Sequence, residues 1–478
     1  MTVRVIAHPS VADRKARGKD AREHTPLTAH LGWIPAADRA DPVALLEEQN
    51  RAREKDLVPV RHGRMLVSPF TFYRGAAKIM AADLKDTPRA GLISQLCGDA
   101  HLSNFGVFAS PERQLMFDLN DFDETLPGPF EYDVKRLCAS ITIAARNNGF
   151  TPTQAYEVTL ATVQAYRGAM REFAQMRVMD IWYAHLSEEE LVKSFNLARD
   201  GEKSKAAKKA VEQAARNTRK NADKARTRDS LQALSKLAEY VDGNYRIVSQ
   251  PPIVVPFREL EHTYGMDAEQ TQDAIHQQLR AYRETLQDDR RHLLERFQII
   301  DVARKVVGVG SVGTRAFIAL LEGRDQQDPL FLQVKEATAS VLEDHLPKSR
   351  YRQPGERVVQ GQRMMQAASD IYLGWTKGVQ EGRFLYWRQL RDMKGSADVE
   401  SMTPFWLAFY GRECAWTLAR AHARSGDPVM IGAYLGKTDA FDLGIADFSH
   451  RYADQNEKDY AAFAEAVRSG RLEAVEGV

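Results

Sequence analysis

Two short polar stretches, each directly after an apolar run, constrain this chain most. The run 91–97 (GLISQLC) is typical of a buried strand and leads into 98–104 (GDAHLSN), and the run 114–119 (QLMFDL) leads into 120–124 (NDFDE). Carboxylates that lie close together repel one another unless a cation or a proton intervenes. Two such stretches at the ends of neighbouring strands therefore predict a site for Mg²⁺, which prefers oxygen ligands.

Turn formation is the alternative explanation for some of these aspartates. An aspartate side chain accepts hydrogen bonds from nearby backbone amides, and the run Asp118-Leu-Asn-Asp121 also suits a turn. Both roles stay open for Asp118. For Asp99 and Asp121 the metal or catalytic role is favoured.

Length, composition and charge bound the class of protein. With 478 residues the chain is too long for one compact core of ordinary size, so we expect two or three packed units. Its 44% hydrophobic and 27% charged residues lie in the globular range. A formal net charge of +1 gives no whole-chain electrostatic reason to expect nucleic acid or an anionic membrane as a partner, and we expect neither.

Cysteine usage and the first residues indicate a compartment. The three cysteines, Cys97, Cys138 and Cys414, form no CxxC pair and no zinc-site spacing, which favours a reducing environment. Residues 1–17 become charged without the apolar core of a signal peptide, and no apolar run reaches membrane-spanning length. We therefore expect a cytoplasmic protein.

The character of the chain changes along its length, and the pattern predicts an α+β fold. Residues 1–60 are typical of an arm or peripheral helices, 61–150 contain both polar stretches, 151–298 form an almost wholly helical block, 299–398 form an antiparallel sheet and 399–478 are closing helices. The strand-like runs of the sheet segment are Ile299–Ala303, Lys305–Gly313, Phe317–Leu321, Leu330–Lys335, Ile371–Trp375 and Phe384–Leu390, with a helix over Glu356–Ser369.

A basic stretch lies inside the helical block. Residues 202–229 hold ten Lys or Arg against four Asp or Glu, with many alanines between them. A charge-rich helix of this kind is usually a solvated face, and this interpretation is favoured. A clamp for an acidic or phosphorylated substrate is the alternative, and the sequence does not decide between them.

The two polar stretches carry a resemblance to a known superfamily. Residues 98–104 resemble the Gly-Asp-x-His-x-x-Asn catalytic loop of aminoglycoside phosphotransferases and choline kinases, which belong to the protein-kinase-like superfamily. Residues 119–124 (LNDFDE) resemble the metal-binding strand end that follows in those enzymes. Residues 128–133 (GPFEYD) resemble the segment that opens their next helix, and by this resemblance Asp133 supports the catalytic loop through hydrogen bonds.

The resemblance implies a phosphotransferase that uses ATP and Mg²⁺. It implies that Asp99 accepts or orients the proton of an attacking hydroxyl group, while His101 orients the loop. It also implies that Asn104 and Asp121 hold Mg²⁺, with Asp123 as an additional ligand. The acceptor is expected to carry a hydroxyl group and is otherwise unidentified, either a small molecule or a protein.

A glycine-rich run supplies the matching phosphate-binding elements. Residues 308–313 (GVGSVG) lie between two strand-like runs and a lysine follows on the next, so the expected nucleotide-binding residues are Gly308, Gly310, Ser311, Gly313 and Lys335. Glycines let backbone N–H groups approach phosphates, and the lysine neutralises them. A dinucleotide-binding fold would need a helix directly after the glycines. The apolar run 317–323 instead ends in a hairpin-like loop, which favours a kinase-like hairpin.

The order of these elements differs from that of the kinases, in which the glycine loop precedes the catalytic loop. We therefore expect a circularly permuted two-lobe kinase-like fold, with a small antiparallel sheet lobe, a mainly helical lobe and a large helical insertion at 151–298 that selects the substrate. The carboxylate partner of Lys335 stays open among Glu336, Glu343 and Glu356.

The chain as a whole is also similar to a bacterial family of unknown function, at 65–75 (MLVSPFTFYRG), 305–315 and 388–395, besides the catalytic loop. Three alternatives to phosphoryl transfer stay open: transfer of AMP on the same fold, a non-catalytic nucleotide-binding pseudokinase, and a metal-dependent hydrolase. The hydrolase would use the carboxylates of both polar stretches without a nucleotide. The sequence predicts no oligomeric state.

Overall fold

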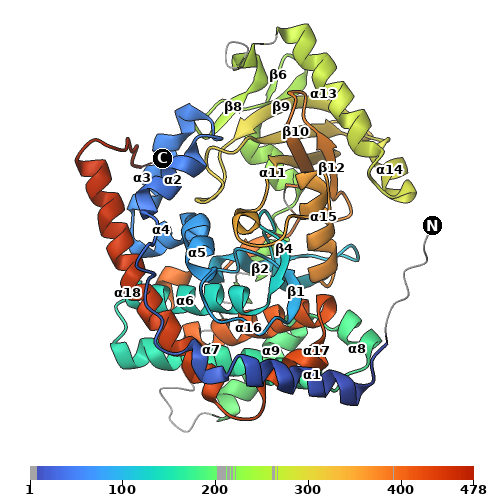
Figure 1. The fold of residues 1–478 in the computed structure, drawn as a ribbon. Coiled ribbons are helices and arrows are strands. Elements are labelled where there is room, and N and C mark those ends of the chain that lie inside the picture. The colour runs from blue at the N-terminus through green and yellow to red at the C-terminus, as the bar shows by residue number, and fades with distance from the viewer. Residues whose placement is uncertain are drawn as a thin grey trace, which may run out of the picture.

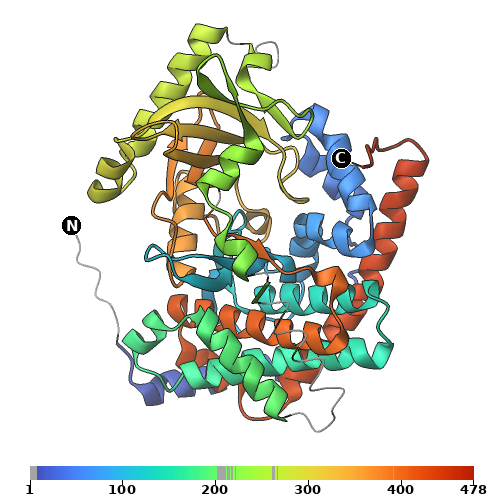
Figure 2. The ribbon, with the colours of Figure 1, turned by 180° about the vertical axis from the view of Figure 1, so that it is seen from behind.

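The computed structural model describes residues 8–201, 212, 216, 219–220, 222–260, 264–265, 267–390 and 392–477. These residues form an α+β protein that is about half helical, with several antiparallel sheets. This confirms the predicted α+β class. The largest sheet lies at one end of the molecule and most of the long helices lie at the other (Figures 1 and 2).

The largest sheet has six antiparallel strands in the order β12-β13-β11-β10-β9-β8. Its centre is the hairpin of β10 and β11, in which Ala316 pairs with Lys335. The connection after β11 contains the helix α15, Pro354–Met365. The strands are β8 Val254–Pro256, β9 Gln298–Lys305, β10 Ala316–Glu322, β11 Pro329–Glu336, β12 Gly374–Lys377 and β13 Phe384–Gln389.

Two of the predicted strands are wrong in their extent. The run 305–313 is not a strand, because β9 ends at Lys305 and the backbone then enters the left-handed region at Gly308 (φ 65°) and Gly313 (φ 87°). The run 371–375 is largely a turn, because a carboxylate oxygen of Asp370 accepts the amide of Tyr372 at 2.8 Å. Strand β12 therefore begins only at Gly374.

Helices cover the two faces of this sheet differently. On one face Leu332 and Val334 pack against Leu279 and Tyr282 of α13, Ala268–Arg283, which is followed by α14, Asp288–Leu294. On the other face Phe331 packs against α11, Ser230–Leu237, and the small β6–β7 hairpin, Ala238–Val241 and Asn244–Ile247. Side chains alternate along a strand, so Lys335 shares the face of Phe331, at the end nearer the helices.

Two smaller sheets carry the polar stretches. Strand β1, Ile93–Leu96, pairs with β4, Leu126–Pro129, and precedes the first stretch. The hairpin of β2, Phe105–Ala109, and β3, Leu115–Leu119, joins the first stretch to the second. Strands β14, Gly395–Ser396, and β5, Leu186–Ser187, complete a four-stranded sheet in the order β14-β2-β3-β5.

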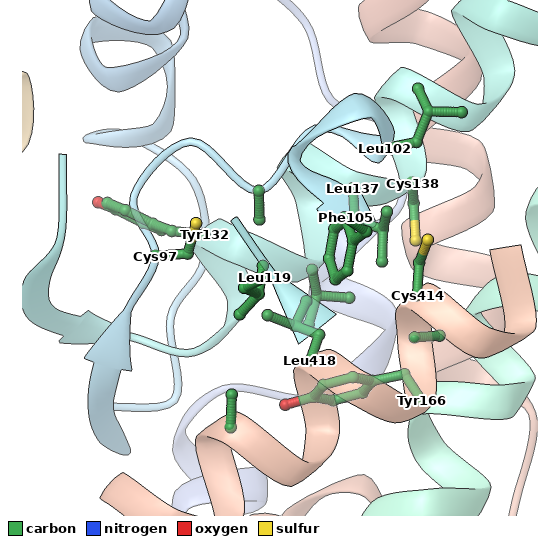
Figure 3. Packing of buried hydrophobic residues seen from close by; sticks show 14 of the residues in the cluster. Cys97, Leu102, Phe105, Leu119, Tyr132, Leu137, Cys138, Tyr166, Cys414 and Leu418 are labelled. Atoms are coloured by element: carbon green, nitrogen blue, oxygen red, sulfur yellow. The ribbon is translucent and has the colours of Figure 1, made fainter. Parts of the chain in front are cut away.

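The main hydrophobic core lies beneath these small sheets. In Figure 3, Leu102, Phe105 and Leu119 from the polar segment meet Leu137 and Cys138 of one helix and Cys414 and Leu418 of another. The helices of this part are α6 Glu131–Asn147, α7 Pro152–Phe173, α8 Val178–Tyr183, α9 Glu188–Gly201, α16 Pro404–Ser425, α17 Pro428–Leu435 and α18 Ala440–Arg468. No described helix is both long and apolar enough to cross a membrane. The basic stretch predicted at 202–229 lies mostly outside the described residues.

The N-terminal helices flank both parts of the molecule (Figure 1). Helix α1 packs along α17, and α2 contributes Val43 and Leu46 to a cluster with Phe463 of α18. Leu57 and Val60 pack against Val306 and Val312 beside the glycine-rich run. These helices are α1 Val11–His24, α2 Pro42–Asn50, α3 Val58–Leu66, α4 Pro69–Gly75 and α5 Ala77–Leu84.

Candidate active site

The first polar stretch is held by a buried carboxylate. Asp133, in the first turn of α6, accepts hydrogen bonds from the amides of Cys97 at 2.7 Å and Gly98 at 3.0 Å. Gly98 has a φ of 86°, and a Cβ atom there would lie 2.1 Å from the carbonyl oxygen of Glu124. Only glycine fits this close approach, so the two polar stretches pack directly against each other.

Arg136 fixes the orientation of Asp99. The Nε atom of Arg136 donates to Asp99 Oδ1 at 2.8 Å, and its Nη2 atom donates to the carbonyl oxygen of Tyr73 at 2.8 Å. His101 Nε2 lies 3.7 Å from Asp99 Oδ2. Burial lowers the pKa of His101 to about 4, so its ring is neutral at neutral pH. The carboxylate of Asp99 is therefore held in one direction while remaining partly exposed.

Asn104 ties the two stretches together. Its Nδ2 atom donates to the carbonyl oxygens of Asp99 at 2.9 Å and Asp121 at 3.2 Å. The side chain of Asp121 is 35% exposed and is available to a ligand. Although burial opposes ionisation, the positive charges of Lys335, Arg388 and Lys394 hold the pKa of Asp121 below its usual range. Asp121 is therefore a carboxylate at neutral pH.

Lys335 joins the large sheet to the second polar stretch. Its Nζ atom lies 2.6 Å from Asp123 Oδ2 and 3.4 Å from Asp121 Oδ2. The hydroxyl group of Tyr386 donates to the other oxygen of Asp123 at 2.6 Å. Burial opposes the charge of Lys335, but the two aspartates keep its pKa above the usual value. Both oxygens of Asp123 are thus engaged by protein groups, whereas Asp121 is less engaged.

Two of the three glutamates considered as partners of Lys335 have arginine neighbours instead. Glu336 points to the other face of the strand and pairs with Arg383 at 2.7 Å. Glu343 lies 3.8 Å from Arg357 of α15. The ion-pair partners of Lys335 are the aspartates of the second polar stretch. The sequence pattern missed them because they lie more than 200 residues away along the chain.

The N-terminal segment binds the glycine-rich run through its carbonyl groups. The amide of Glu54 donates to the carbonyl oxygen of Gly313 at 2.8 Å, and Arg64 Nη1 donates to that of Gly308 at 2.6 Å. The guanidinium of Arg53 donates to the carbonyl oxygen of Val312. Among the described residues, no partner takes the amide N–H groups of Gly310, Ser311 and Gly313. This run therefore has backbone donors available for an anion.

A cleft of about 390 Å³ lies between these elements. Both polar stretches and the glycine-rich run contribute to its wall, and most of the predicted site residues line it: Asp99, His101, Asn104, Asp121, Asp123, Gly308, Gly310 and Ser311. Gly313 packs against Arg53 at the edge, Lys335 is buried behind the aspartates, and Asp133 is buried beneath the first stretch. The cleft also contains Arg53 and Arg74, which sequence reasoning missed.

The oxygen donors of this cleft fit Mg²⁺ only in part. In the described part of the chain no group of three or more His, Cys, Asp or Glu side chains is arranged to hold a metal ion. Asp121 and the side-chain oxygen of Asn104 supply two suitable donors. Mg²⁺ commonly uses one or two carboxylates and completes its coordination with water and substrate phosphates. The donor set therefore fits a Mg²⁺ ion that arrives with a phosphate ligand.

Asp118 has a structural role. Its Oδ1 atom pairs with Arg420 of α16 and its Oδ2 atom accepts the amide of Ala367 at 2.9 Å. Both side chains of the ion pair are about 1% exposed. Asp118 therefore lies behind the cleft and contributes no ligand to it.

The fold and the cleft define an α+β protein in which aspartates and a glycine-rich run face each other across one cavity. The chain belongs to the bacterial family described as "Uncharacterized protein conserved in bacteria (DUF2252)", whose model matches residues 53–466. The matched range contains both polar stretches, the glycine-rich run and Lys335. No curated protein and no solved structure matches the chain.

Proposed function

We propose that this protein is a Mg²⁺-dependent phosphotransferase of the kinase-like type, which moves the terminal phosphoryl group of ATP to a hydroxyl group of an acceptor. The observation that carries the proposal is the contact of Lys335 with Asp121 and Asp123 beside the glycine-rich run. Lys335 lies directly behind two aspartates of the cleft wall, and phosphoryl transfer requires a phosphate-binding lysine close to a metal-binding aspartate.

The order of elements supports a permuted kinase-like arrangement. After β9 the chain forms the glycine-rich run, β10, β11 with Lys335, the helix α15, the strands β12 to β14 and then the long helix α16. In kinases such a long helix runs into the catalytic loop. Here the hydroxyl oxygen of its last residue, Ser425, accepts a hydrogen bond from the amide of Gln95 at 3.1 Å, within β1, the strand that leads to Asp99. The two ends of the proposed permutation are therefore in contact.

Each residue of the site has its own role in the proposed reaction. The acceptor oxygen attacks the terminal phosphorus of ATP, its proton passes to Asp99, and the bond to the ADP oxygen breaks so that ADP leaves. The glycine-run amides and Lys335 bind the phosphates. Asn104 and Asp121 would hold Mg²⁺, which neutralises charge on the phosphate oxygens. Asp123 positions Lys335 through the ion pair between them, which a glutamate was expected to provide.

Mass spectrometry tests this proposal. The protein is incubated with Mg·ATP and pools of hydroxyl compounds or bacterial proteins, and the products are compared with those of D99N. A phosphoryl adduct that needs Asp99 supports the proposal. An AMP adduct would assign nucleotidyl transfer instead. Nucleotide binding with no adduct in any pool would favour a pseudokinase, and metal-dependent hydrolysis without ATP would favour a hydrolase.

A further inference from the structure

The N-terminal helices bring an arginine into the cleft that belongs to none of the kinase-like motifs. Arg74 lies in the last turn of α4, inside the stretch 65–75 that resembles the bacterial family. Its side chain lines the cleft together with Asp99 and Gly310. The proposed catalytic roles leave this residue unused.

The backbone places Arg74 between the glycine-rich run and the segment that holds Asp99. Its carbonyl oxygen would lie 3.1 Å from a Cβ atom at Gly310, so α4 directly contacts the glycine-rich run. The preceding residue, Tyr73, is bound through its carbonyl oxygen to Arg136, which also holds Asp99. The end of α4 therefore contacts the glycine-rich run on one side and is bound on the other to Arg136, the residue that holds Asp99.

The guanidinium of Arg74 has no partner in the part of the chain that the structure describes. Among the described residues it makes no hydrogen bond and no ion pair, and its Nε atom is fully buried. Burial lowers its pKa, although Asp99 acts in the opposite direction. Lys78, another cation of the cleft wall, does have partners: it pairs with Glu48 at 3.2 Å and with Asp344 at 3.1 Å. A partly buried cation that makes no hydrogen bond or ion pair is costly, so its position in the cleft wall points to an anionic ligand.

We propose that Arg74 binds the terminal phosphoryl group of ATP during its transfer. This inference rests on the proposed function and adds a contact to it. The glycine-rich run and Lys335 bind the inner phosphates, while Arg74 faces the position next to Asp99 where the acceptor attacks. Its planar guanidinium donates to two phosphate oxygens at once and stabilises the charge that these oxygens carry as the bond to ADP breaks.

Comparison of ATP and ADP binding isolates this contact, because the two nucleotides differ only in the terminal phosphate. Affinities of both, with Mg²⁺, are measured calorimetrically for the unaltered protein, R74M, R74K and K78M. We expect R74M to lose about tenfold or more in ATP affinity with ADP affinity unchanged. R74K keeps the positive charge but lacks the two parallel N–H donors of the guanidinium, so it should lose less ATP affinity. R74K also replaces R74M if R74M fails to fold. K78M removes a charge from the same wall and should keep the preference for ATP.

The outcomes separate the two proposals. Failure of the unaltered protein to bind either nucleotide would contradict the proposed function itself. If the unaltered protein binds ATP, an equal loss of ATP and ADP affinity in R74M, or no loss of either, would overturn the assignment of Arg74 alone. A loss of the preference for ATP in K78M as large as that in R74M would also overturn it, because a general charge effect would then explain the result.

Discussion

The ammonium nitrogen of Lys335 lies 2.6 Å from Asp123 Oδ2, although 212 residues separate the two along the chain. Asp123 also accepts a hydrogen bond from Tyr386, so its carboxylate joins two strands of the large sheet to the end of β3. Asp121, two residues earlier, remains accessible from the cleft. The two aspartates of this short loop therefore differ: Asp123 has the closer contacts with Lys335 and Tyr386, and Asp121 is the less engaged of the two.

Substitution of these two aspartates should separate their roles. D123N removes the closest charge partner of a buried lysine, and we expect it to lower the free energy of unfolding by about 1–3 kcal/mol. D121N should leave stability nearly unchanged or raise it and abolish the Mg²⁺ dependence of nucleotide binding. Urea unfolding and Mg²⁺ titrations check both. Equal losses of stability in the two variants would contradict the division.

Asp99 should matter for turnover and little for binding. It contacts Arg136 and lines the cleft, whereas the groups proposed to bind the phosphates belong to other elements. We expect D99N to lower the rate of phosphoryl transfer about 10²–10⁴-fold and to leave the affinity for Mg·ATP within about threefold. Steady-state rates and calorimetry measure the two quantities. Full activity in D99N would contradict the proposed role of Asp99 in proton transfer.

Arg357 should couple α15 to the second polar stretch. Its guanidinium donates to the carbonyl oxygens of Thr125 at 2.6 Å and of Asp123 and Thr338 at 2.8 Å. R357M leaves these buried acceptors unpaired, so we expect a loss of about 2–4 kcal/mol in unfolding free energy and weaker ATP binding. R363M is the matched control on the same helix, because the guanidinium of Arg363 donates to the carbonyl oxygen of Leu373 at 2.6 Å and does not line the cleft. Unchanged hydrogen exchange at 120–126 in R357M would count against the coupling.

His30 should make the fold sensitive to acid. Burial lowers the pKa of His30 to about 3, and its ring contacts the hydroxyl group of Tyr434 at 3.0 Å. The unfolded chain therefore binds a proton near pH 6.5, while the folded protein resists protonation until about pH 3. Stability is lost as the pH falls through this window, by about 2–4 kcal/mol in total.

Denaturant unfolding between pH 7 and pH 4 measures this effect. H30Q should flatten the dependence of unfolding free energy on pH, at some cost in stability at neutral pH. The exposed His24 on α1 provides the control, since H24Q should leave the acid dependence nearly as it is. An unaltered slope in H30Q would show that other groups cause the acid sensitivity.

Local patterns predicted the parts of this fold that local forces determine. The hairpin of β10 and β11 follows from two apolar runs around a polar loop. The end of β9 was missed because the sequence alternation continues where the glycines at 308 and 313 turn the backbone. The start of β12 was missed because the turn there depends on a side-chain bond from Asp370.

The candidate site was predictable only in part. Asp99, Asn104 and Asp121 stand in short runs whose residue types and spacing indicate a ligand site, and the structure brings them to one cleft. The contributions of Arg53 and Arg74 left no local signal, because each acts on residues more than 20 positions away. The partner of Lys335 depends likewise on a contact across the whole fold.

The central claim is that the cleft binds Mg·ATP through Lys335, and calorimetric titration of the unaltered protein and K335M tests it most directly. We expect one site with a Kd in the range of about 1 μM to 1 mM for the unaltered protein, loss of binding when Mg²⁺ is chelated, and affinity lowered at least about tenfold in K335M. No binding by the unaltered protein, or equal affinity in a folded K335M variant, would contradict the account.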